Sequence, residues 1–339
     1  MKRTIALLLA ALLLGAAGCA APVAAPVPTP APTPEPVGMK KIFGKDITIA
    51  CDADEQSWFA QGVTAQAEEL GIPVVWVKAG ETAGDGMIIS APQASFSTRI
   101  PAIYHTANVE DALPIPDGCC GVVYDAAAEV EAALAAMYTY PSHEAPVRVL
   151  GMFGEQDGEA HAAYLAMAEA GKLQDKGVFV PSDGVIPEQA GRWLRDTLSG
   201  ITPGRLDTVF SDAPALALEG FAVLKEAKRS DAVEICARGL LPAHVQAMIE
   251  DHFLMGTAVG ENGYGAGKLA VRMLAHLLAG EAVEESYTLL PLCVRSEDVI
   301  ELYRAGTTEV NDIMMTLDTQ TEQAYQADFL DELRENHTA

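Results

Sequence analysis

The chain has 339 residues, of which 50% are hydrophobic and only 6% aromatic, and its formal net charge is −25. This length favours two domains or one large domain, and the composition supplies a sizeable core built mainly from aliphatic side chains. A chain this acidic repels phosphate backbones, which argues against nucleic acid as a partner.

The N-terminus has the pattern of a secretory signal. Basic residues precede an apolar run at Ile5–Leu14, and small residues lead from there to Cys19. The run is too short for a membrane-spanning helix. The segment resembles a bacterial lipoprotein signal, which implies that residues 1–18 are removed and that Cys19 carries lipid, anchoring the protein at the extracytoplasmic face of the cell membrane. The alternative is an ordinary secretory signal cleaved near Ala17 or Ala20.

Residues 19–39 alternate proline with small residues. Alternating proline favours an extended polyproline II conformation without internal hydrogen bonds. We therefore expect a semi-rigid tether between the lipid and the folded part of the chain.

The remaining cysteines and the chemical motifs predict neither a metal site, nor a cofactor, nor an enzyme. Five cysteines follow Cys19, without a C-x-x-C pair or a zinc-finger histidine, so we expect free thiols. Cys51, Cys236 and Cys293 lie in apolar runs and should be buried. No H-E-x-x-H pair and no G-x-S-x-G elbow occurs, and the glycines around residues 151–158 do not form a phosphate loop.

From Lys40 onward, strand patterns alternate with helix patterns, which predicts parallel sheets covered on both faces. The predicted strands are Asp46–Cys51, Ile72–Val77, Met87–Ser90, Ile100–Tyr104, Gly121–Tyr124, Val147–Met152, Gly177–Val180, Asp207–Phe210, Ala232–Cys236 and Thr257–Val259. The predicted helices are Gln56–Leu70, Asp125–Tyr140, Gly158–Ala170, Glu188–Ser199, Ala213–Lys228, Pro242–Asp251 and Gly263–Ala279. One further apolar segment spans Ser286–Val294, and one or two amphipathic helices are expected in the tail.

Over about residues 46–298, the chain resembles the type I periplasmic binding proteins, the sugar-binding branch related to LacI-type repressors. The resemblance rests on the order of units such as DITIACDADEQSWFAQGVTAQAEELGIPVVWV, DTVFSDAPALALEGFAVLKEA and GTAVGENGYGAGKLAVRMLAHLLAGE. It implies an α/β fold with two doubly wound parallel-sheet lobes joined by a hinge. Ligand would bind between the carboxyl ends of the two sheets, a location that the general rule for open parallel sheets also predicts.

The resemblance also implies how the chain is divided. Lobe one would take residues 40–122 plus 260–284, lobe two 123–259 plus 285–305, and a helical tail 306–339, with hinge strands near 122–125, 259–262 and 284–287. Only about nine residues separate Val77 from the next predicted strand, and only about nine separate Ser90 from the strand after that. A parallel crossover needs at least about 10–12 residues. We therefore expect lobe one to lack two helices, so that tail helices or a partner cover its sheet, or its strands pair antiparallel.

The ligand contacts that the resemblance implies lie at strand ends. After the first strand come Asp52, Gln56, Trp58 and Phe59, and an aromatic ring there would stack on the ligand. Trp58 is the better candidate, because Phe59 fits the buried stripe of the helix; alternatively, both rings belong to the core. The other expected contacts are His105, Glu155, Asp212, Arg238, Glu261 and Tyr264. Asp212 alternatively caps the following helix.

Several of these residues depart from the family's pattern. His105 stands where many members carry an Asp-Arg pair, and Glu261 replaces a frequent glutamine, so the resemblance does not imply a plain pentose or hexose. It implies a lipid-anchored solute-binding protein that captures a small polar, sugar-like or related molecule for an ABC transporter permease. The alternative is a sensory or protein-interaction module of the same fold that reports to a membrane receptor.

Overall fold

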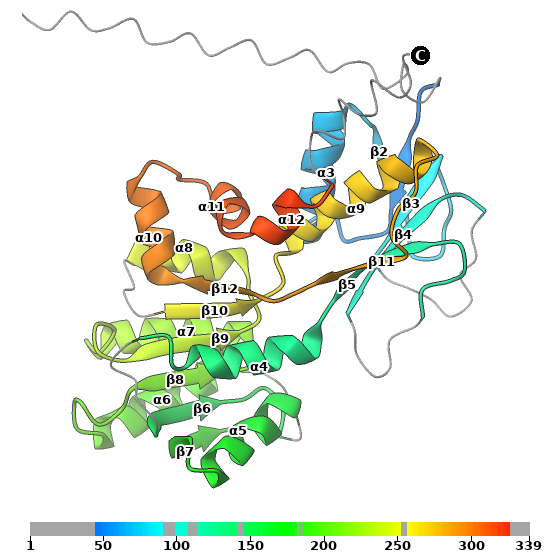
Figure 1. Ribbon diagram of the computed structural model, residues 1–339. Helices are drawn as coiled ribbons and strands as arrows, with labels where there is room; N and C mark the ends of the chain where they lie inside the picture. The colour runs from blue at the N-terminus through cyan, green and yellow to red at the C-terminus, as the bar shows by residue number, and fades with distance from the viewer. Residues whose placement is uncertain are drawn as a thin grey trace, which may run out of the picture. The chain divides into compact units, whose positions relative to one another are not determined.

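The computed structural model describes residues 45–90, 99–107, 114–140, 146–156, 158–181, 184, 186–251 and 256–325. These residues form two six-stranded sheets with helices packed against them, which confirms the predicted fold class (Figure 1). The predicted signal, the tether, Cys19 and the end of the tail lie outside the described residues. No helix in the described part of the chain is long and apolar enough to cross a membrane.

The first sheet has the strand order β11-β5-β4-β3-β1-β2, and every pairing in it is parallel. The alternative of antiparallel pairing is therefore wrong. Its strands are β1 Ile49–Cys51, β2 Val74–Trp76, β3 Gly86–Ile89, β4 Ala102–Ala107, β5 Cys120–Tyr124 and β11 Ser286–Leu289. Helices α3 (Trp58–Leu70) and α9 (Gly263–Leu278) cover one face of this sheet and pack closely on each other.

Loops cover part of the other face. No helix lies between β2 and β3, as predicted; the next crossover includes residues 91–98, outside the described residues. The buried side chains on this face belong to a cluster around Met87, Ile89 and Tyr104. Partly buried loop residues pack against them: Val77, Ala83, Ile100 and Ile115. The described tail helices pack elsewhere, and the rest of the tail that was expected to cover this face, residues 326–339, lies outside the described residues.

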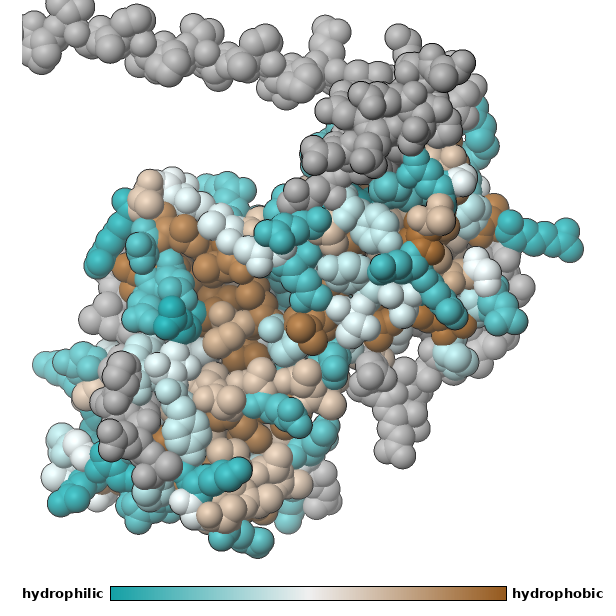
Figure 2. Space-filling view, viewed as in Figure 1, coloured by the Kyte–Doolittle hydropathy of each residue, from teal (hydrophilic) through white to brown (hydrophobic). Residues whose placement is uncertain are grey.

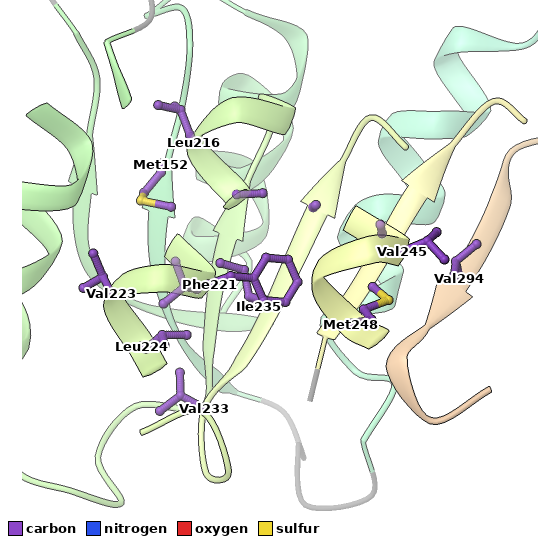
Figure 3. Close-up of a cluster of buried hydrophobic side chains, with 14 of the residues drawn as sticks. Met152, Leu216, Phe221, Val223, Leu224, Val233, Ile235, Val245, Met248 and Val294 are labelled. Carbon is purple, nitrogen blue, oxygen red and sulfur yellow. The ribbon is translucent and has the colours of Figure 1, made fainter. Parts of the chain in front are cut away.

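The second sheet has the order β12-β10-β9-β8-β6-β7, with only β12 antiparallel to its neighbour. Its strands are β6 Val147–Met152, β7 Leu173–Phe179, β8 Thr208–Ser211, β9 Glu234–Arg238, β10 Gly256–Gly260 and β12 Leu292–Arg295. The helices on it are α4 Ala126–Ala136, α5 Glu159–Glu169, α6 Pro187–Gly200, α7 Pro214–Glu226, α8 Pro242–Asp251 and α10 Ser296–Arg304. Figure 3 shows apolar side chains of strands and helices, among them Met152, Phe221 and Ile235, meeting in its core.

Three sequence predictions fail in this region, for physical reasons. Ser286–Val294 is not one segment: it forms β11 in the first sheet and β12 in the second, separated by exposed Leu290 and by Pro291, which lacks an N–H donor. The chain therefore crosses between sheets there, and not near residues 284–287. Strand β7 starts before the predicted Gly177, because an edge strand tolerates polar residues. Helix α10 was not predicted at all.

The described cysteines are free thiols, as expected. Cys51 and Cys236 are buried, but Cys293 is exposed, because it lies on the edge strand β12. An area of apolar side chains runs over β12 and the alanine-rich helix α4 on the face that Figure 2 shows.

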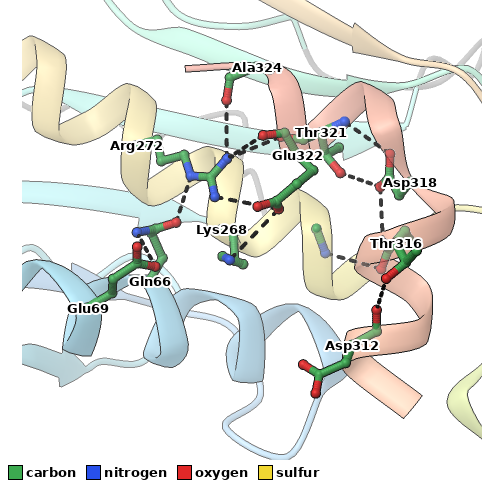
Figure 4. A network of polar contacts seen from close by, with 12 residues as sticks. Gln66, Glu69, Lys268, Arg272, Asp312, Thr316, Asp318, Thr321, Glu322 and Ala324 are labelled. Atoms are coloured by element: carbon green, nitrogen blue, oxygen red, sulfur yellow. Dashed lines mark hydrogen bonds and ion pairs between the residues drawn. The ribbon is translucent and has the colours of Figure 1, made fainter. Parts of the chain in front are cut away.

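The C-terminal segment packs against elements of both sheets. Ile313 and Met314 of α11 (Val310–Leu317) belong to the core of the second sheet, whereas α12 (Thr319–Gln323) lies on α9, which covers the first. Arg272 of α9 donates to the carbonyl oxygens of residues 321, 322 and 324, each at 3.3 Å (Figure 4). Asp318 accepts a 3.0 Å hydrogen bond from Asn262 Nδ2, directly after β10.

Gln320 of α12 binds the crossing between β11 and β12. Its amide Nε2 donates to Thr288 O at 2.9 Å, and its Oε1 accepts from the backbone N–H of Leu290 at 3.1 Å. The chain passes between the two sheets three times, after β5, after β10 and after β11. The tail is therefore hydrogen-bonded to two of these passages, the one after β10 and the one after β11.

The contact between α3 and α9 depends on glycine. A Cβ atom at Gly267 would lie 2.1 Å from the Phe59 carbonyl oxygen, and backbone cannot give way as a flexible side chain can. We expect Gly267→Ala to lower the free energy of unfolding by about 1–3 kcal/mol, as overpacking does. The measurement is urea denaturation of the purified chain.

Gly200→Ala is the matched control, because Gly200 is also a helical glycine, the last residue of α6, but has no atom within 4 Å of an added Cβ. It should change stability by less than about 1 kcal/mol, in the stabilising direction. Equal stability of the two variants would contradict the close contact.

Candidate functional site

Polar and aromatic side chains from both sheets meet where strands end. We call them the strand-end cluster: Phe59, His105, Tyr124, Glu129, Asp212, Arg238 and Glu261. The parallel strands β1, β4, β5, β8, β9 and β10 run in register, so the residues at or soon after their carboxyl ends arrive on one side of each sheet. Five of the seven were predicted from the sequence; Tyr124 and Glu129 were not.

One half of the cluster joins β4 to the passage after β10. The Nε2 atom of His105 lies 2.6 Å from Oε1 of Glu261, and the two side chains are 18% and 21% exposed. The imidazole stacks on the ring of Phe59, with centroids 4.2 Å apart and planes at 14°. Phe59 itself is 7% exposed, so it belongs both to the core and to the cluster.

The other half surrounds Arg238 at the end of β9. Its Nε atom lies 3.8 Å from Oε2 of Glu129, in the first turn of α4. The other oxygen of Glu129 accepts a 3.0 Å hydrogen bond from the backbone N–H of Gly239. Tyr124 ends β5 beside both glutamates, and its hydroxyl makes no hydrogen bond of good geometry within the described residues.

Asp212 follows β8 and turns toward the neighbouring strand end. Its Oδ1 accepts a 2.7 Å hydrogen bond from the backbone N–H of Gly154, after β6. Arg238 and His161 add favourable charge interactions, and Glu155 an unfavourable one. The alternative of a helix cap is wrong, because α7 has Ala213 at its N-cap and no side-chain hydrogen bond there.

The electrostatics of the cluster are dominated by burial. Burial raises the pKa of Glu129, although Arg238, Tyr124 and the Gly239 N–H favour its charged form, and Glu261 adds to the rise. Burial likewise raises the pKa of Asp212 against the Gly154 N–H and Arg238. Tyr124 has a raised pKa for the same reason, followed by the charges of Glu129 and Glu261. Burial therefore disfavours the charged forms of Glu129 and Asp212 more than Arg238 favours them.

The structure places the other predicted contacts away from the cluster centre. Trp58 donates its indole N–H to Oδ1 of Asn311 in α11, at 2.8 Å, and packs against the core of the second sheet. Tyr264 faces the carboxylates of Glu69, Asp312 and Glu322, which raise its pKa in addition to burial. Both aromatic rings therefore meet elements near the tail helices.

Gln56 and Asp52 lie nearer the edge of the first sheet. Gln56 lines a surface pocket of about 560 Å³ with Trp76, Lys78 and neighbouring acidic residues. Asp52 Oδ1 accepts from the backbone N–H of Ser90 at 2.6 Å and from its hydroxyl at 3.2 Å, so it ties the ends of β1 and β3. Its other oxygen has no hydrogen-bond partner among the described residues. Glu155 is exposed beside Asp212.

Tyr124 and Glu129 were missed because each has an ordinary role in the sequence. In the sequence, Tyr124 has the pattern of the last core residue of a strand. Glu129 has the pattern of an acidic residue that favours a helix N-terminus. Only the packing of α4 on β9 and β10 brings Glu129 to Arg238. Only their positions in the sequence could have indicated a place in the site, since both residues stand at or just after a strand end.

The arrangement is suited to binding. Carboxylates, a guanidinium, an imidazole and an aromatic ring can grip a small polar molecule through directed hydrogen bonds and a flat surface. Burial raises the pKa of Cys51 to about 12, and likewise raises those of Cys119 and Cys120, so these thiols stay protonated and unreactive. No group of three or more possible metal ligands occurs within the described ranges.

Comparisons with known proteins identify solved structures of similar fold. No family model matches this chain, and no curated protein matches it. The sugar ABC transporter from Yersinia enterocolitica subsp. enterocolitica 8081 aligns with a TM-score of 0.59 at 16% identity, over 90% of this chain and 98% of that one. The 5-methylthioribose transporter solute binding protein from Thermotoga lettingae TMO aligns with a TM-score of 0.56 at 14% identity, over 86% and 98%.

A third similarity involves a sensor complex. A chain of the TorS sensor domain–TorT complex aligns with a TM-score of 0.54 at 13% identity, over 75% of this chain and 94% of that one. At such low identities, these alignments establish the fold and leave the ligand and the partner to be argued from this chain's own residues.

The buried carboxylate of Glu129 makes stability depend on pH in a defined direction. Its raised pKa means that the folded protein gains stability from the protonated form, fully below the ordinary value of 4.5, and loses it as the pH rises through the raised pKa. Glu129→Gln removes that loss. We expect this variant to be more stable than the parent at pH 8, by about 1.4 kcal/mol for each unit of pKa shift, and equal to it near pH 4.

The measurement is thermal unfolding between pH 4 and pH 8. Glu131→Gln is the control, because Glu131 is exposed on the same helix and should leave the pH profile unchanged. A parent that is more stable than Glu129→Gln at pH 8 would show that the Arg238 pair, and not burial, dominates at Glu129.

Proposed function

We propose that this chain, which has the type I periplasmic binding protein fold, is an extracytoplasmic solute-binding protein that holds a small polar ligand at the strand-end cluster. The observation that carries the proposal is that side chains of the two sheets meet at strand ends: His105 contacts Glu261 after β10, and Tyr124 lies beside Glu129 and Arg238. A ligand gripped from both sides gains contacts only when both sheets approach it, so binding and movement at the passages are coupled.

The proposed partner is an ABC transporter permease. The Yersinia and Thermotoga proteins of similar fold are described as transporter components, one of them for 5-methylthioribose. The signal pattern ending at Cys19 supports attachment by lipid, and the proline-rich residues 19–39 support a tether that holds the lobes away from the bilayer. Lipid attachment would keep the protein near a permease in the same membrane.

A second candidate is a sensory module of the same fold. It is favoured by the similarity to the TorS–TorT complex and by the first sheet, where no helix covers the crossover between β2 and β3. A receptor could use the surface that such a helix occupies in a longer crossover. The two candidates differ in their protein partner, and they share the ligand site.

A thermal-shift screen of the purified full chain tests the ligand site. The panel holds sugars, nucleosides, amino acids, polyamines and short peptides. A ligand at 100 times its dissociation constant stabilises the folded state by about 2.7 kcal/mol, which raises the midpoint by several degrees in a chain of this size. A cooperative melt that no member of a broad panel shifts would count against a small-molecule site.

Two variants then identify the aromatic surface. Phe59→Leu retains an apolar side chain but loses the stack on His105, and we expect it to weaken the selected ligand about two- to tenfold, the size of one aromatic contact. Trp58→Phe is the matched control, because the indole N–H is already engaged by Asn311. Loss of binding in Trp58→Phe alone would instead favour the indole, the better candidate on sequence grounds.

The lipid anchor has its own test. We expect Cys19→Ala to move the protein from the membrane fraction to the soluble extracytoplasmic fraction and to abolish labelling by a radioactive fatty acid. Ligand binding should stay unchanged, because Cys19 is distant in sequence from the cluster. Unchanged labelling and membrane association would contradict lipidation at Cys19 and favour another mode of attachment.

A further inference from the structure

We infer that the ligand is a hydroxylated amine, a small molecule that carries one protonated amino group among several hydroxyls, in preference to a neutral sugar. This inference rests on the proposed function of the strand-end cluster as the ligand site, and it names the chemical class that the cluster selects.

The first argument is charge. The cluster contains the carboxylates of Glu129, Asp212 and Glu261 against the single guanidinium of Arg238. His105 already directs Nε2 to Glu261 at 2.6 Å. The side chains of Glu129 and Glu261 are only 11% and 21% exposed, so water screens their charges poorly. A bound cation would offset this excess.

The second argument is hydrogen-bond capacity. An ionised carboxylate only accepts hydrogen bonds, so three carboxylates require donors, and an ammonium group supplies three N–H donors together with a positive charge. A neutral hydroxyl supplies one donor and leaves the charge uncompensated. Glu261 is the residue of choice for this contact, because it stands between the two halves of the cluster and also acts electrostatically on Tyr124 and Glu129.

The third argument is that acceptors are also needed. The Tyr124 residue is 6% exposed, and neither its hydroxyl nor the buried Nε atom of Arg238 makes a hydrogen bond of good geometry within the described residues, although Glu129 lies beside both. Buried donors without acceptors are costly, and a ligand hydroxyl beside them would accept from one or both. An amine without hydroxyls would leave Glu129, at poor hydrogen-bond geometry, as the acceptor for these two donors. The cluster as a whole therefore fits an amine that carries hydroxyls.

The test compares matched ligands by isothermal titration calorimetry on the purified full chain at low ionic strength. Two triplets are used: glucosamine, glucose and N-acetylglucosamine, and galactosamine, galactose and N-acetylgalactosamine. Within a triplet the ring hydroxyls stay the same, apart from position 2, and only the first member carries a cation. We expect the amine to bind at least tenfold more tightly than either neutral partner in at least one triplet, and the advantage to shrink as salt is added.

Variants connect the preference to the cluster. Glu261→Gln keeps the side chain's shape and an oxygen for His105 but removes the charge, and we expect it to reduce the amine advantage at least tenfold while neutral sugars bind as well as before or better. Asp212→Asn provides a second, independent reduction. Glu131→Gln, an exposed change of the same charge, should leave the preference unchanged. A cooperative melt of each variant excludes misfolding.

The outcomes separate this inference from the proposed function. Neutral sugars that bind as tightly as their amines, or more tightly, would overturn the amine preference and leave a solute-binding site in place. An amine advantage that survives Glu261→Gln and Asp212→Asn would overturn the role of the cluster. Absence of binding by both triplets and by the broad panel of the thermal-shift screen would overturn the inference together with the proposed function.

Discussion

Three consecutive residues, the last of β10 and the two that follow it, carry the constraint on which the rest of the structure depends. Gly260 has no room for a side chain, because a Cβ atom there would lie 2.4 Å from the backbone nitrogen of Leu240. Glu261 holds His105 of the first sheet. Asn262 caps α9 by accepting from Gly265 N–H at 3.1 Å and donates to Asp318 of the tail. The passage, the site and the tail are therefore tied through one short segment.

This arrangement gives the tail a mechanical role. Asp318 binds the passage after β10, Gln320 binds the crossing after β11, and α11 buries Ile313 and Met314 in the core of the second sheet. Any rotation of one sheet against the other changes the positions to which these groups are bonded. The tail thus contributes to the energy difference between arrangements of the two sheets.

Electrostatics link the whole chain to the site. The net charge of −25 attracts cations from a distance, and the strand-end cluster holds carboxylates with little exposure. The raised pKa values of Glu129 and Asp212 show that their surroundings disfavour uncompensated charge. A site of this kind gains most from a ligand that supplies both a positive charge and hydrogen-bond donors.

Periodic apolar patterns made much of the fold predictable. Val147–Met152 and Pro242–Asp251 were predicted with the bounds that the structure has, because a continuous apolar run marks a buried strand and a proline marks a helix start. The short crossover after Val77 correctly indicated a missing helix, since chain length alone forbids one. Such features are local, so the sequence by itself determined the order of elements from β1 to α9 and the parallel pairing of the strands, whereas five members of the strand-end cluster came from the family resemblance.

Tertiary packing decided what local pattern leaves open. Ser286–Val294 forms strands in two different sheets, because pairing partners, and not its own apolarity, assign a strand to a sheet. Glu129 reaches Arg238 only because α4 packs on β9 and β10, and Trp58 turns to Asn311 because the tail returns to α3 from 253 residues further along the chain. Contacts between residues so far apart depend on how elements stack, and no local propensity or periodicity encodes that.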